Sequence, residues 1–190
     1  MDTSDRDSSV APLDLHPARL LELCATERLG RTIYLFDAAE STNALAMAAS
    51  AEGARDGTLF LAEEQTRGRG RKGREWRSAR GKSLTMSLLL RPARREEAVT
   101  AAFALAVARA LDQCAGSLFI KWPNDIYIGG RKLGGILAEA RGETIVIGLG
   151  LNVNEEAADF PPDLSGAAVS LRMAEGKRFD RGVVLCRILE

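Results

Sequence analysis

Apolar residues recur with two different spacings along this chain, and the spacing predicts where strands and helices lie. Residues 83–90, SLTMSLLL, form an apolar run that suits a buried strand. The segment that begins at Glu96 and Glu97 carries an apolar stripe with helical spacing, and the two acidic residues favour the dipole of a helix that starts there. The stripe consists of Val99, Phe103, Val107, Leu111 and Cys114. This region therefore predicts a strand followed by a long helix.

Shorter patterns of the same two kinds precede this strand. The expected helices cover residues 18–30 and 41–54, and the expected strands cover residues 32–36 and 57–65. Ser41 or Thr42 is the expected N-cap of the second helix, which is rich in alanine. Residues 1–16 are rich in Asp, Ser and Pro and are predicted to be disordered.

The rest of the chain is mostly strand. The segments SLFIKW, DIYIG, RKLGGILAEA and ETIVIGLGLNVN are separated by short turns, which include Gly129-Gly130 and Arg141-Gly142. Such a series predicts an antiparallel meander. The whole chain then has an α+β fold, in which helices pack on one side of a mostly antiparallel sheet. We expect one domain over residues 17–180, and residues 181–190 as the start of a further helix.

Composition describes an ordinary globular chain with one unusual charge cluster. Apolar residues make up 46% of the 190 residues, which is enough for one domain with a core. Lys and Arg number 26 and so do Asp and Glu, so the net charge is zero and argues against a dedicated nucleic-acid binder. Between Arg67 and Lys82, however, eight basic residues accompany one acid, Glu75.

The cysteines and the single histidine exclude several kinds of site. Cys24, Cys114 and Cys186 are widely spaced and odd in number, so we expect reduced, mostly buried thiols in a cytosolic protein. With His16 as the only histidine, neither a His-based triad nor a His-rich metal site is expected. The acidic N-terminus lacks the apolar run of a signal peptide, and no apolar stretch is long enough to span a membrane.

The basic cluster contains the segment RGRGRKGREW at residues 67–76, which admits three interpretations. It could be a solvated charged hairpin. It could be an arm that binds nucleic acid, although Trp76 is its one aromatic residue and offers no stacking series. It could also be a mobile lid that closes over a small anionic ligand, because arginine binds phosphate with a planar fork and glycines allow close packing. The segment by itself does not decide between them.

Two further segments have polar residues where a strand meets a turn. In KWPND, Lys121, Asn124 and Asp125 either form a turn or lie at the lip of the sheet, facing a ligand that carries phosphate. At the start of the second helix, Ser41 and Thr42 either cap the helix or hold a polar or anionic group.

Two strand segments combine glycine with a polar residue. In RKLGGIL, strict strand alternation predicts that Lys132, Gly134 and Ile136 share one side of the sheet, with the lysine either reaching a ligand or facing solvent. In GLGLNVN, two glycines inside a strand are expected to make room for another group, and Asn152 ends the strand in a position to hydrogen-bond a ligand.

These five segments occur in one order, STN, EQTRGRGRKGREW, KWPND, KLGGIL and GLGLNVN, and together they resemble the catalytic domain of biotin protein ligase. The likeness runs from about Ile33 to about Asn154. It implies the biotin–lipoate ligase fold, which is similar to that of class II aminoacyl-tRNA synthetases. Arg67 departs from the family pattern, where a small residue is usual. We expect neither a winged-helix DNA-binding domain before this segment nor the SH3-like C-terminal domain after it.

The resemblance also implies an activity. Biotin protein ligases activate biotin with ATP and Mg²⁺ to give biotinyl-5'-AMP, and then transfer biotin to a lysine of the biotin carboxyl carrier protein of acetyl-CoA carboxylase. The expected protein is thus a cytoplasmic biotin–[acetyl-CoA-carboxylase] ligase that binds neither DNA nor membrane, with a homodimer as its candidate assembly. The alternatives are a lipoate–protein ligase and a non-catalytic regulatory module that binds biotin or RNA.

Residue roles follow from the same likeness. The expected biotin contacts are Ser41, Thr42, Asn43, Gln65, Gly68, Arg69, Arg71, Trp76, Lys132, Gly134 and Gly135. The expected ATP contacts are Arg71, Arg74, Lys121, Asn124, Lys132 and Asn152. The expected catalytic residues are Lys132, Arg69, Arg71 and Asp125, with Lys132 as the main one. The basic segment is then a lid that orders around an acyl-adenylate.

Overall fold

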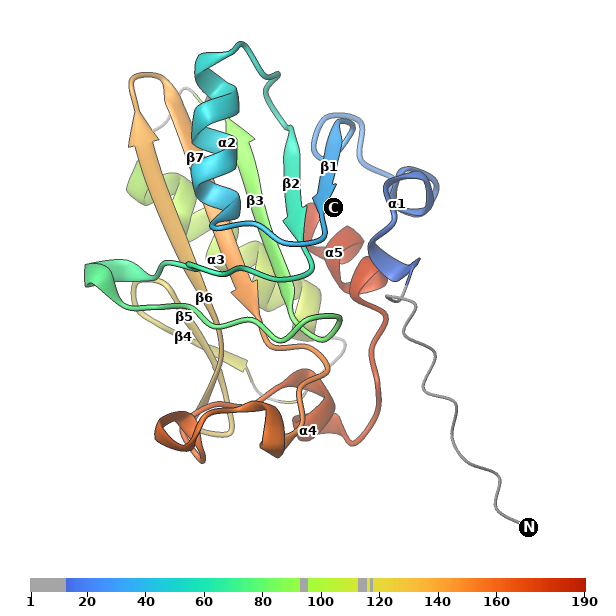
Figure 1. The fold of residues 1–190 in the computed structure, drawn as a ribbon, viewed down its shortest axis with the longest axis vertical. Coiled ribbons are helices and arrows are strands. Elements are labelled where there is room, and N and C mark those ends of the chain that lie inside the picture. Colours follow the sequence, from blue (N-terminus) through green and yellow to red (C-terminus); the bar gives the residue numbers. More distant parts are fainter. Residues whose placement is uncertain (1–12, 93–95, 113–115, 117) are drawn as a thin grey trace.

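In the computed structural model, which describes residues 13–92, 96–112, 116 and 118–190, the strands form a single mixed sheet (Figure 1). Across this part of the chain, seven strands lie in the order β1-β2-β3-β7-β6-β5-β4. They are β1 (Ile33–Phe36), β2 (Leu59–Ala62), β3 (Leu84–Leu90), β4 (Leu118–Lys121), β5 (Asp125–Ile128), β6 (Arg131–Arg141) and β7 (Thr144–Leu151). Only β1 and β2 pair in parallel, and the other neighbours are antiparallel. The predicted α+β class and the meander from β4 to β7 are confirmed.

Helices cover both faces of the sheet. The α-helices are α1 (Pro17–Leu23), α2 (Thr42–Ala51), α3 (Glu96–Asp112), α4 (Leu171–Glu175) and α5 (Arg181–Leu189). Short 3₁₀ helices lie at η1 (Leu13–Leu15), η2 (Arg71–Gly73), η3 (Ala157–Asp159) and η4 (Pro162–Leu164). In Figure 1, α2 crosses in front of the sheet and α3 lies behind it. The expected placement of helices on one side therefore holds for α3 and α5, whereas α2 covers the other face.

Strand alternation produces this two-sided packing. Alternate residues of β3, such as Leu84 and Leu88, enter the main core together with residues of α3 and α5. Leu89, whose side chain points the opposite way, joins Phe60 and Val146 in a smaller cluster beneath α2. Each fully buried leucine of this kind stabilises the fold by roughly 1.5–3 kcal/mol.

The two ends of the described chain are joined, which the sequence patterns did not predict. The helix expected over residues 18–30 ends at Leu23, and the backbone of the next residue, Cys24, is extended. Cys24 forms a disulfide with Cys186 of α5, with 4.8 Å between their Cα atoms. The expectation of free thiols is wrong for this pair, because 162 positions of sequence separate residues that the fold brings together. Cys114, expected in the stripe of α3, lies outside the described residues.

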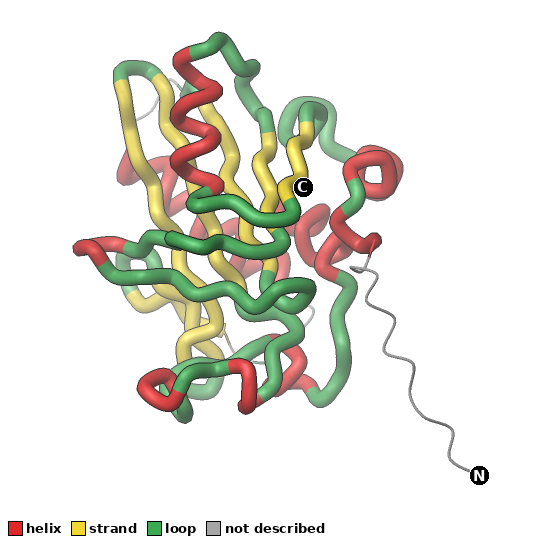
Figure 2. Tube along the Cα trace, in the orientation of Figure 1, coloured by secondary structure: helices red, strands yellow, loops and turns green. Residues whose placement is uncertain are grey.

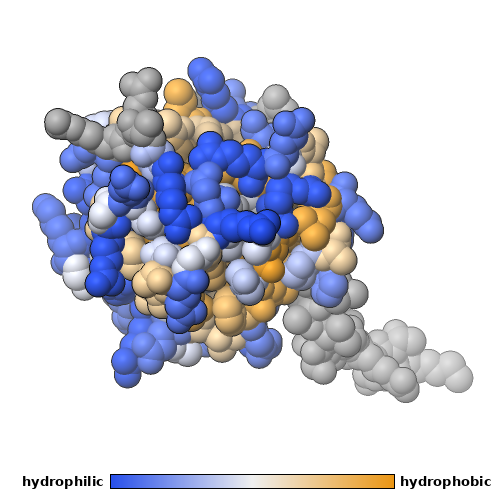
Figure 3. Space-filling model, turned by 90° about the horizontal axis from the view of Figure 1, so that it is seen from above, coloured by the Kyte–Doolittle hydropathy of each residue, from blue (hydrophilic) through white to orange (hydrophobic). Residues whose placement is uncertain are grey.

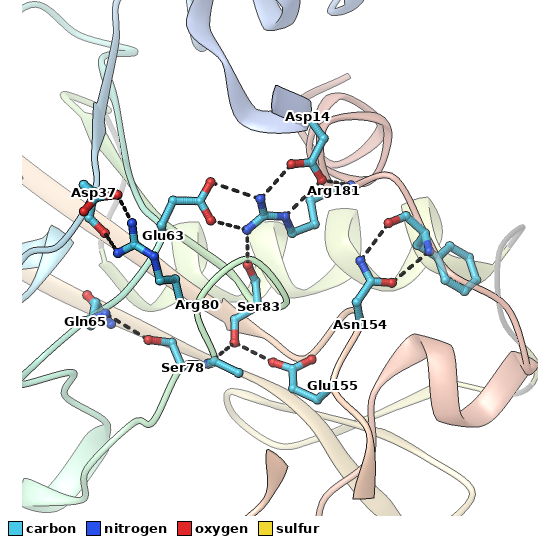
Figure 4. A network of polar contacts seen from close by, with 12 residues as sticks. Asp14, Asp37, Glu63, Gln65, Ser78, Arg80, Ser83, Asn154, Glu155 and Arg181 are labelled. Carbon is cyan, nitrogen blue, oxygen red and sulfur yellow. Dashed lines mark hydrogen bonds and ion pairs between the residues drawn. The ribbon is translucent and has the colours of Figure 1, made fainter. Parts of the chain in front are cut away.

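A buried arginine reinforces the same junction (Figure 4). All five N–H groups of Arg181 donate hydrogen bonds, to both carboxylate oxygens of Asp14, to both of Glu63 and to the carbonyl oxygen of Ser83. Burial alone lowers the pKa of Arg181, but the two carboxylates outweigh it and raise that pKa above its ordinary value. Asp14 and the buried Leu15 thus belong to an ordered turn. The predicted disorder is wrong for residues 13–16, while residues 1–12 lie outside the described part.

Polar side chains cover most of one end of the molecule, with apolar surface in patches between them (Figure 3). Among the described residues, no helix is both long enough and apolar enough to cross a membrane.

Candidate functional site

A cavity of about 1090 Å³ lies on the face of the sheet that carries the predicted site residues. Ser41, Thr42, Asn43, Gln65, Arg69, Arg71, Arg74, Trp76, Lys121, Asn124, Asp125, Lys132, Gly135 and Asn152 all line it. The remaining two predicted residues, Gly68 and Gly134, do not. Five segments that are far apart in the sequence therefore meet around one space. The volume exceeds the usual size of a pocket for a single small molecule.

One end of the cavity is formed by the N-terminus of α2. Ser41 is the N-cap, as predicted, and its hydroxyl accepts a hydrogen bond from the backbone of Ala44. The backbone N–H of Thr42 donates to Oε1 of Gln65 at 2.8 Å, and the Thr42 hydroxyl lies 3.1 Å from the same oxygen. The hydroxyl of Ser87, on β3, donates to Oδ1 of Asn43 at 2.6 Å. Polar side chains with fixed orientations thus surround this end.

The glycines of β7 make room for two of the lining side chains. A β-carbon placed on Gly148 would lie 2.2 Å from Oδ1 of Asn43, and one on Gly150 would lie 2.2 Å from Cε2 of Trp76. The amide and the indole therefore rest directly on the sheet. This confirms the prediction that the two glycines make room for other groups.

The basic segment crosses the face of the sheet below α2 (Figures 1 and 2). It is a narrow hairpin in which Gly70 N–H donates to the carbonyl of Arg74 at 2.7 Å, and Trp76 N–H donates to that of Gly68 at 2.9 Å. A side chain on Gly68 would collide with the backbone of Trp76, so this glycine serves the hairpin and not the cavity wall. Two long contacts of 3.3 Å join the hairpin to the sheet: Arg69 to Glu139, and Arg71 to Asn124.

Ion pairs neutralise part of the basic cluster. Arg67, Arg69, Arg77, Arg80 and Lys82 pair with Glu40, Glu139, Glu75, Asp37 and Asp159, respectively. Arg71, Lys72 and Arg74 line the cavity and make no ion pair with any residue that the structure describes. Three positive charges are thus available to an anion that enters the cavity.

Lys132 and Asp125 form the charged pair on the opposite wall. Nζ of Lys132 lies 2.9 Å from Oδ1 of Asp125, and 31% of the lysine side chain is exposed. The amide of Asn124 donates to the same oxygen of Asp125 and to the carbonyl of Ile136. The segment around Ala168 also fixes the backbone of Lys132, because the two pair through backbone hydrogen bonds.

The face that Lys132 occupies differs from the prediction. A bulge in β6 pairs Lys132 with Tyr127 and Gly134 with Ile126, so Leu133 is an extra residue between them. Lys132 therefore faces the cavity with Gly135, whose added β-carbon would lie 3.5 Å from Nζ. The expectation that Lys132 shares a side with Gly134 and Ile136 is wrong. A β-carbon on Gly134 would lie 2.8 Å from the carbonyl oxygen of Gly150, which places that glycine within the sheet.

The β4–β5 turn forms the rim next to this wall. The peptide bond between Trp122 and Pro123 is cis, and Trp122 is 75% exposed. Lys121 lies with its ammonium 5.3 Å from the ring centroid of Tyr127, so its charge is held over an aromatic face.

The structure adds residues that the sequence reasoning missed. Thr85 and Ser87 of β3, and Ser83 directly before this strand, are buried hydroxyl residues, although 83–90 was interpreted only as an apolar run. Their alternate spacing was the available signal. Glu155, which follows β7, is also buried, and its Oε1 accepts a hydrogen bond of 2.5 Å from Ser83. No sequence signal marked it.

Burial controls the charge of Glu155. Removal from water raises its pKa to about 7, against the opposing effect of the hydrogen bond from Ser83. The nearby Asp159 adds to the rise. Near neutral pH this carboxyl group therefore exists in both protonation states.

The fold, the cavity and the order of the five segments define a class of protein with a cationic site between a basic hairpin and a mixed sheet. Residues 35–152 match the biotin/lipoate A/B protein ligase family, and the chain belongs to this family. The predicted resemblance is confirmed. The described residues contain no group of three or more His, Cys, Asp or Glu residues that could hold a metal ion.

Several relatives carry names or ligands that bear on function. The chain is 40% identical over 173 residues to the bifunctional ligase/repressor BirA of Bacillus subtilis, covering 86% of this chain and 53% of that protein. It is 36% identical over 172 residues to the biotin–[acetyl-CoA-carboxylase] ligase of Mycobacterium tuberculosis, covering 84% and 63%. The chain thus spans less than two thirds of the length of each of these two curated relatives.

Among solved structures, the fold is similar to biotin protein ligase from Aquifex aeolicus in complex with biotin and ATP, with a TM-score of 0.74 and 31% identity. The likeness covers 84% of this chain and 67% of that one.

Proposed function

We propose that this chain contains the catalytic unit of a biotin–protein ligase, within residues 17–180. The observation that carries the proposal is one cavity in which polar residues at the α2 end, the Lys132–Asp125 pair and three uncompensated cations of the lid face one another. This arrangement suits two anionic substrates, the carboxylate of biotin and ATP, whose approach requires fixed positive charge. The names of the relatives support the same substrates.

The reaction has two steps. A carboxylate oxygen of biotin attacks the α-phosphorus of ATP, the bond to the bridging oxygen breaks, and pyrophosphate leaves with that electron pair. The amine of a carrier lysine then attacks the acyl carbon of biotinyl-5'-AMP, AMP leaves, and the amine loses its proton. The described residues need supply no nucleophile, because both nucleophiles belong to the substrates.

Within this proposal, Lys132 stabilises the negative charge that develops between the carboxylate and the α-phosphate. Asp125, 2.9 Å from its ammonium, keeps the lysine oriented. Ser41, Thr42 and Gln65 bind the ureido group of biotin. Arg69 and Arg71 close the lid over the adenylate, which is a reactive mixed anhydride that must be kept from water.

Further cavity residues complete the two substrate sites. Asn43, Trp76 and Gly135 add to the biotin side, and Arg74, Lys121, Asn124 and Asn152 add to the nucleotide side. Gly68 and Gly134 act indirectly, by permitting the hairpin and the close pairing of β6 with β7.

Mg²⁺ fits this site as an ion that arrives with the nucleotide. Asn124 and Asp125 offer oxygen atoms beside the proposed phosphate position, and Mg²⁺ bound to ATP often needs only one or two protein ligands. The ion would neutralise the charge of the departing pyrophosphate.

The proposed protein partner is a biotin carboxyl carrier protein, such as that of acetyl-CoA carboxylase. A homodimer and a cytoplasmic location also belong to the proposal. Reduced cysteines would have favoured a cytoplasmic location. Because Cys24 and Cys186 form a disulfide, these two residues do not support it.

Exchange of radiolabelled pyrophosphate into ATP tests the first step. We expect exchange that depends on biotin and is absent with lipoate, because lipoate lacks the ureido group that the α2 end is proposed to bind. Exchange that depends on lipoate would establish a lipoate–protein ligase. If neither acid supports exchange, while biotin still binds, the chain is a non-catalytic module.

A further inference from the structure

Three buried hydroxyl groups, which we call the hydroxyl row, lie at alternate positions: Ser83 directly before β3, and Thr85 and Ser87 within it. Because they occupy alternate positions, they share one face of the strand, and Thr85 itself lines the cavity. Ser87 at one end lies 2.7 Å from the Thr42 hydroxyl and donates to Asn43. Ser83 at the other end accepts from the backbone of Ala79 at 2.8 Å and donates to Glu155. Both ends of the row are therefore occupied by hydrogen bonds within the protein.

The hydroxyl of Thr85, in the middle of the row, and the second carboxylate oxygen of Glu155 have no hydrogen bond to any residue that the structure describes. In the described part of the chain, the buried polar side-chain atoms without a hydrogen-bond partner are Thr85 Oγ1, Glu155 Oε2 and Trp76 Nε1. All three residues line the cavity. Glu155 and Thr85 are each only 2% exposed. Buried polar groups without partners are costly, so their concentration in one cavity points to a ligand that supplies the partners.

The protonation of Glu155 defines the kind of partner it needs. Its Oε1 accepts the Ser83 hydrogen bond, so a proton on the neutral acid resides on Oε2 and makes that atom a donor. Burial favours this neutral form up to about pH 7. The charged groups around it are Asp159 from η3, Lys82 ahead of β3, which pairs with Asp159, and Arg181 from α5, which donates to the Ser83 carbonyl. None of them forms an ion pair with Glu155 itself.

Thr85 and Glu155 lie away from the α2 end of the cavity, where the ureido group of biotin is proposed to bind. Ser83 is four residues from Ser87 along the strand, which corresponds to roughly 13 Å. Thr85 pairs in register with Gly150, the residue on which the indole of Trp76 rests. Glu155 follows Asn152 by three residues, beyond the end of β7. The free polar atoms thus lie beside an aromatic ring, at a distance from the Thr42 end, and suit a flat heterocycle with polar edges.

We propose that Glu155 and Thr85 form a hydrogen-bonding subsite for the nucleoside part of the nucleotide, in which Oε2 of Glu155 donates to an acceptor of the base or ribose. This rests on the proposed ligase function and adds to it a residue pair that selects the nucleoside. Thr85, with one hydroxyl, binds a second polar atom of the same group.

Steady-state pyrophosphate exchange on four variants tests this subsite. Glu155→Leu and Thr85→Val each remove one hydrogen bond and should raise the KM for ATP roughly three- to tenfold, while the KM for biotin stays within a factor of two. Glu155→Gln should keep near-wild-type KM for ATP, because its amide remains a donor when its oxygen accepts from Ser83. Glu143→Gln, on the exposed β6–β7 turn, is the matched control and should change nothing.

The pH dependence separates recognition from a purely structural role. The KM for ATP of the wild type should rise above about pH 7 relative to that of Glu155→Gln, which has no proton to lose. The titration of ATP itself is common to both proteins and cancels in their ratio.

Three results would overturn the inference: an unchanged KM for ATP in both Glu155→Leu and Thr85→Val, a change confined to the KM for biotin, or a ratio that does not vary with pH. Calorimetric titration with ATP is run on the same proteins. A wild type that binds ATP through these two residues but shows no exchange would contradict the proposed reaction and leave the subsite standing.

Discussion

The two most elaborate groups of charges in this protein differ in whether the protein itself satisfies them. At the junction of the chain ends, Arg181 is completely buried and uses every N–H group on Asp14, Glu63 and a carbonyl oxygen. Around the cavity, Arg71, Lys72 and Arg74 form no ion pair with any described residue. Lys132 pairs with Asp125 but remains partly exposed to the cavity. Charged groups are therefore fully hydrogen-bonded within the protein at the junction, whereas those around the cavity can still bind a ligand.

This difference distinguishes a structural charge from a binding charge. A guanidinium whose donors are all occupied has nothing to offer a ligand and acts only through folding. Cations held near one another without counter-charges repel each other, and an anion that enters relieves this repulsion. The account therefore predicts that substitutions at the junction change stability, and that substitutions at the cavity change catalysis.

The largest effect is expected at the junction. Arg181→Met should lower the free energy of unfolding by roughly 3–5 kcal/mol, because it leaves two buried carboxylates without their partner. Urea unfolding measures the loss. Arg172→Met, which removes an arginine from the more exposed pair with Glu156, is the control and should cost less than about 1 kcal/mol. Equal losses in the two variants would contradict the distinction.

The next effect is expected at the cavity. Lys132→Ala should slow formation of the adenylate by about 10²–10³, since loss of one such charge typically costs roughly 2–4 kcal/mol in the transition state. Its urea midpoint should stay near that of the wild type. Lys177→Ala removes a lysine that lies over Phe179 outside the cavity and serves as the control. Wild-type exchange rates in Lys132→Ala would remove the lysine from its proposed role.

Much of this contrast could be predicted from the sequence, but only on the cavity side. The local segments that contain Lys132, Arg71 and Trp76 have residue types that indicate a ligand-binding site. The strand patterns predicted that these segments lie on one sheet. The Arg181 cluster joins residues from η1, the end of β2 and α5, and no local pattern marks a contact that spans 167 positions. The Cys24–Cys186 bond escaped for the same reason.

The errors at the site also have a physical cause. Strict alternation put Lys132 on the same side as Gly134, and a single bulged residue, Leu133, reversed that assignment. Glu155 was missed because its importance comes from burial and from Ser83, and neither can be seen in its neighbours along the chain.

Glu155 provides a test in which stability depends on pH. The unfolded chain releases its proton near pH 4.5, whereas the folded protein keeps it up to about pH 7. The stabilisation is therefore complete below pH 4.5 and is lost as the pH rises through 7, by up to roughly 3 kcal/mol. Glu155→Gln lacks this titration, so its free energy of unfolding relative to the wild type should increase between pH 5 and pH 8. A constant difference over that range would show that the buried group does not titrate.

A smaller and more selective effect is expected from the lid. Arg71→Gly should allow biotinyl-5'-AMP to escape, and the free intermediate should then acylate lysines of added bovine albumin. Arg67→Gly makes the same change in the same segment at a residue that does not line the cavity, and it should leave albumin unlabelled. Streptavidin blotting reads both. A variant that makes adenylate and labels only the carrier would show that Arg71 does not contain the intermediate.

Limited trypsinolysis tests most directly whether the unpaired cations of the basic segment bind a nucleotide together with biotin. Every basic residue between Arg67 and Lys82 is a possible cleavage site. The ligand-free protein should be cut there first, giving fragments of about 8 and 12 kDa in proportion to the 20.5 kDa chain. Biotin should slow this cleavage, biotin with ATP should slow it further, and RNA should have no effect. Cleavage that biotin and ATP leave unchanged, but that RNA prevents, would contradict the account and identify the segment as a nucleic-acid arm.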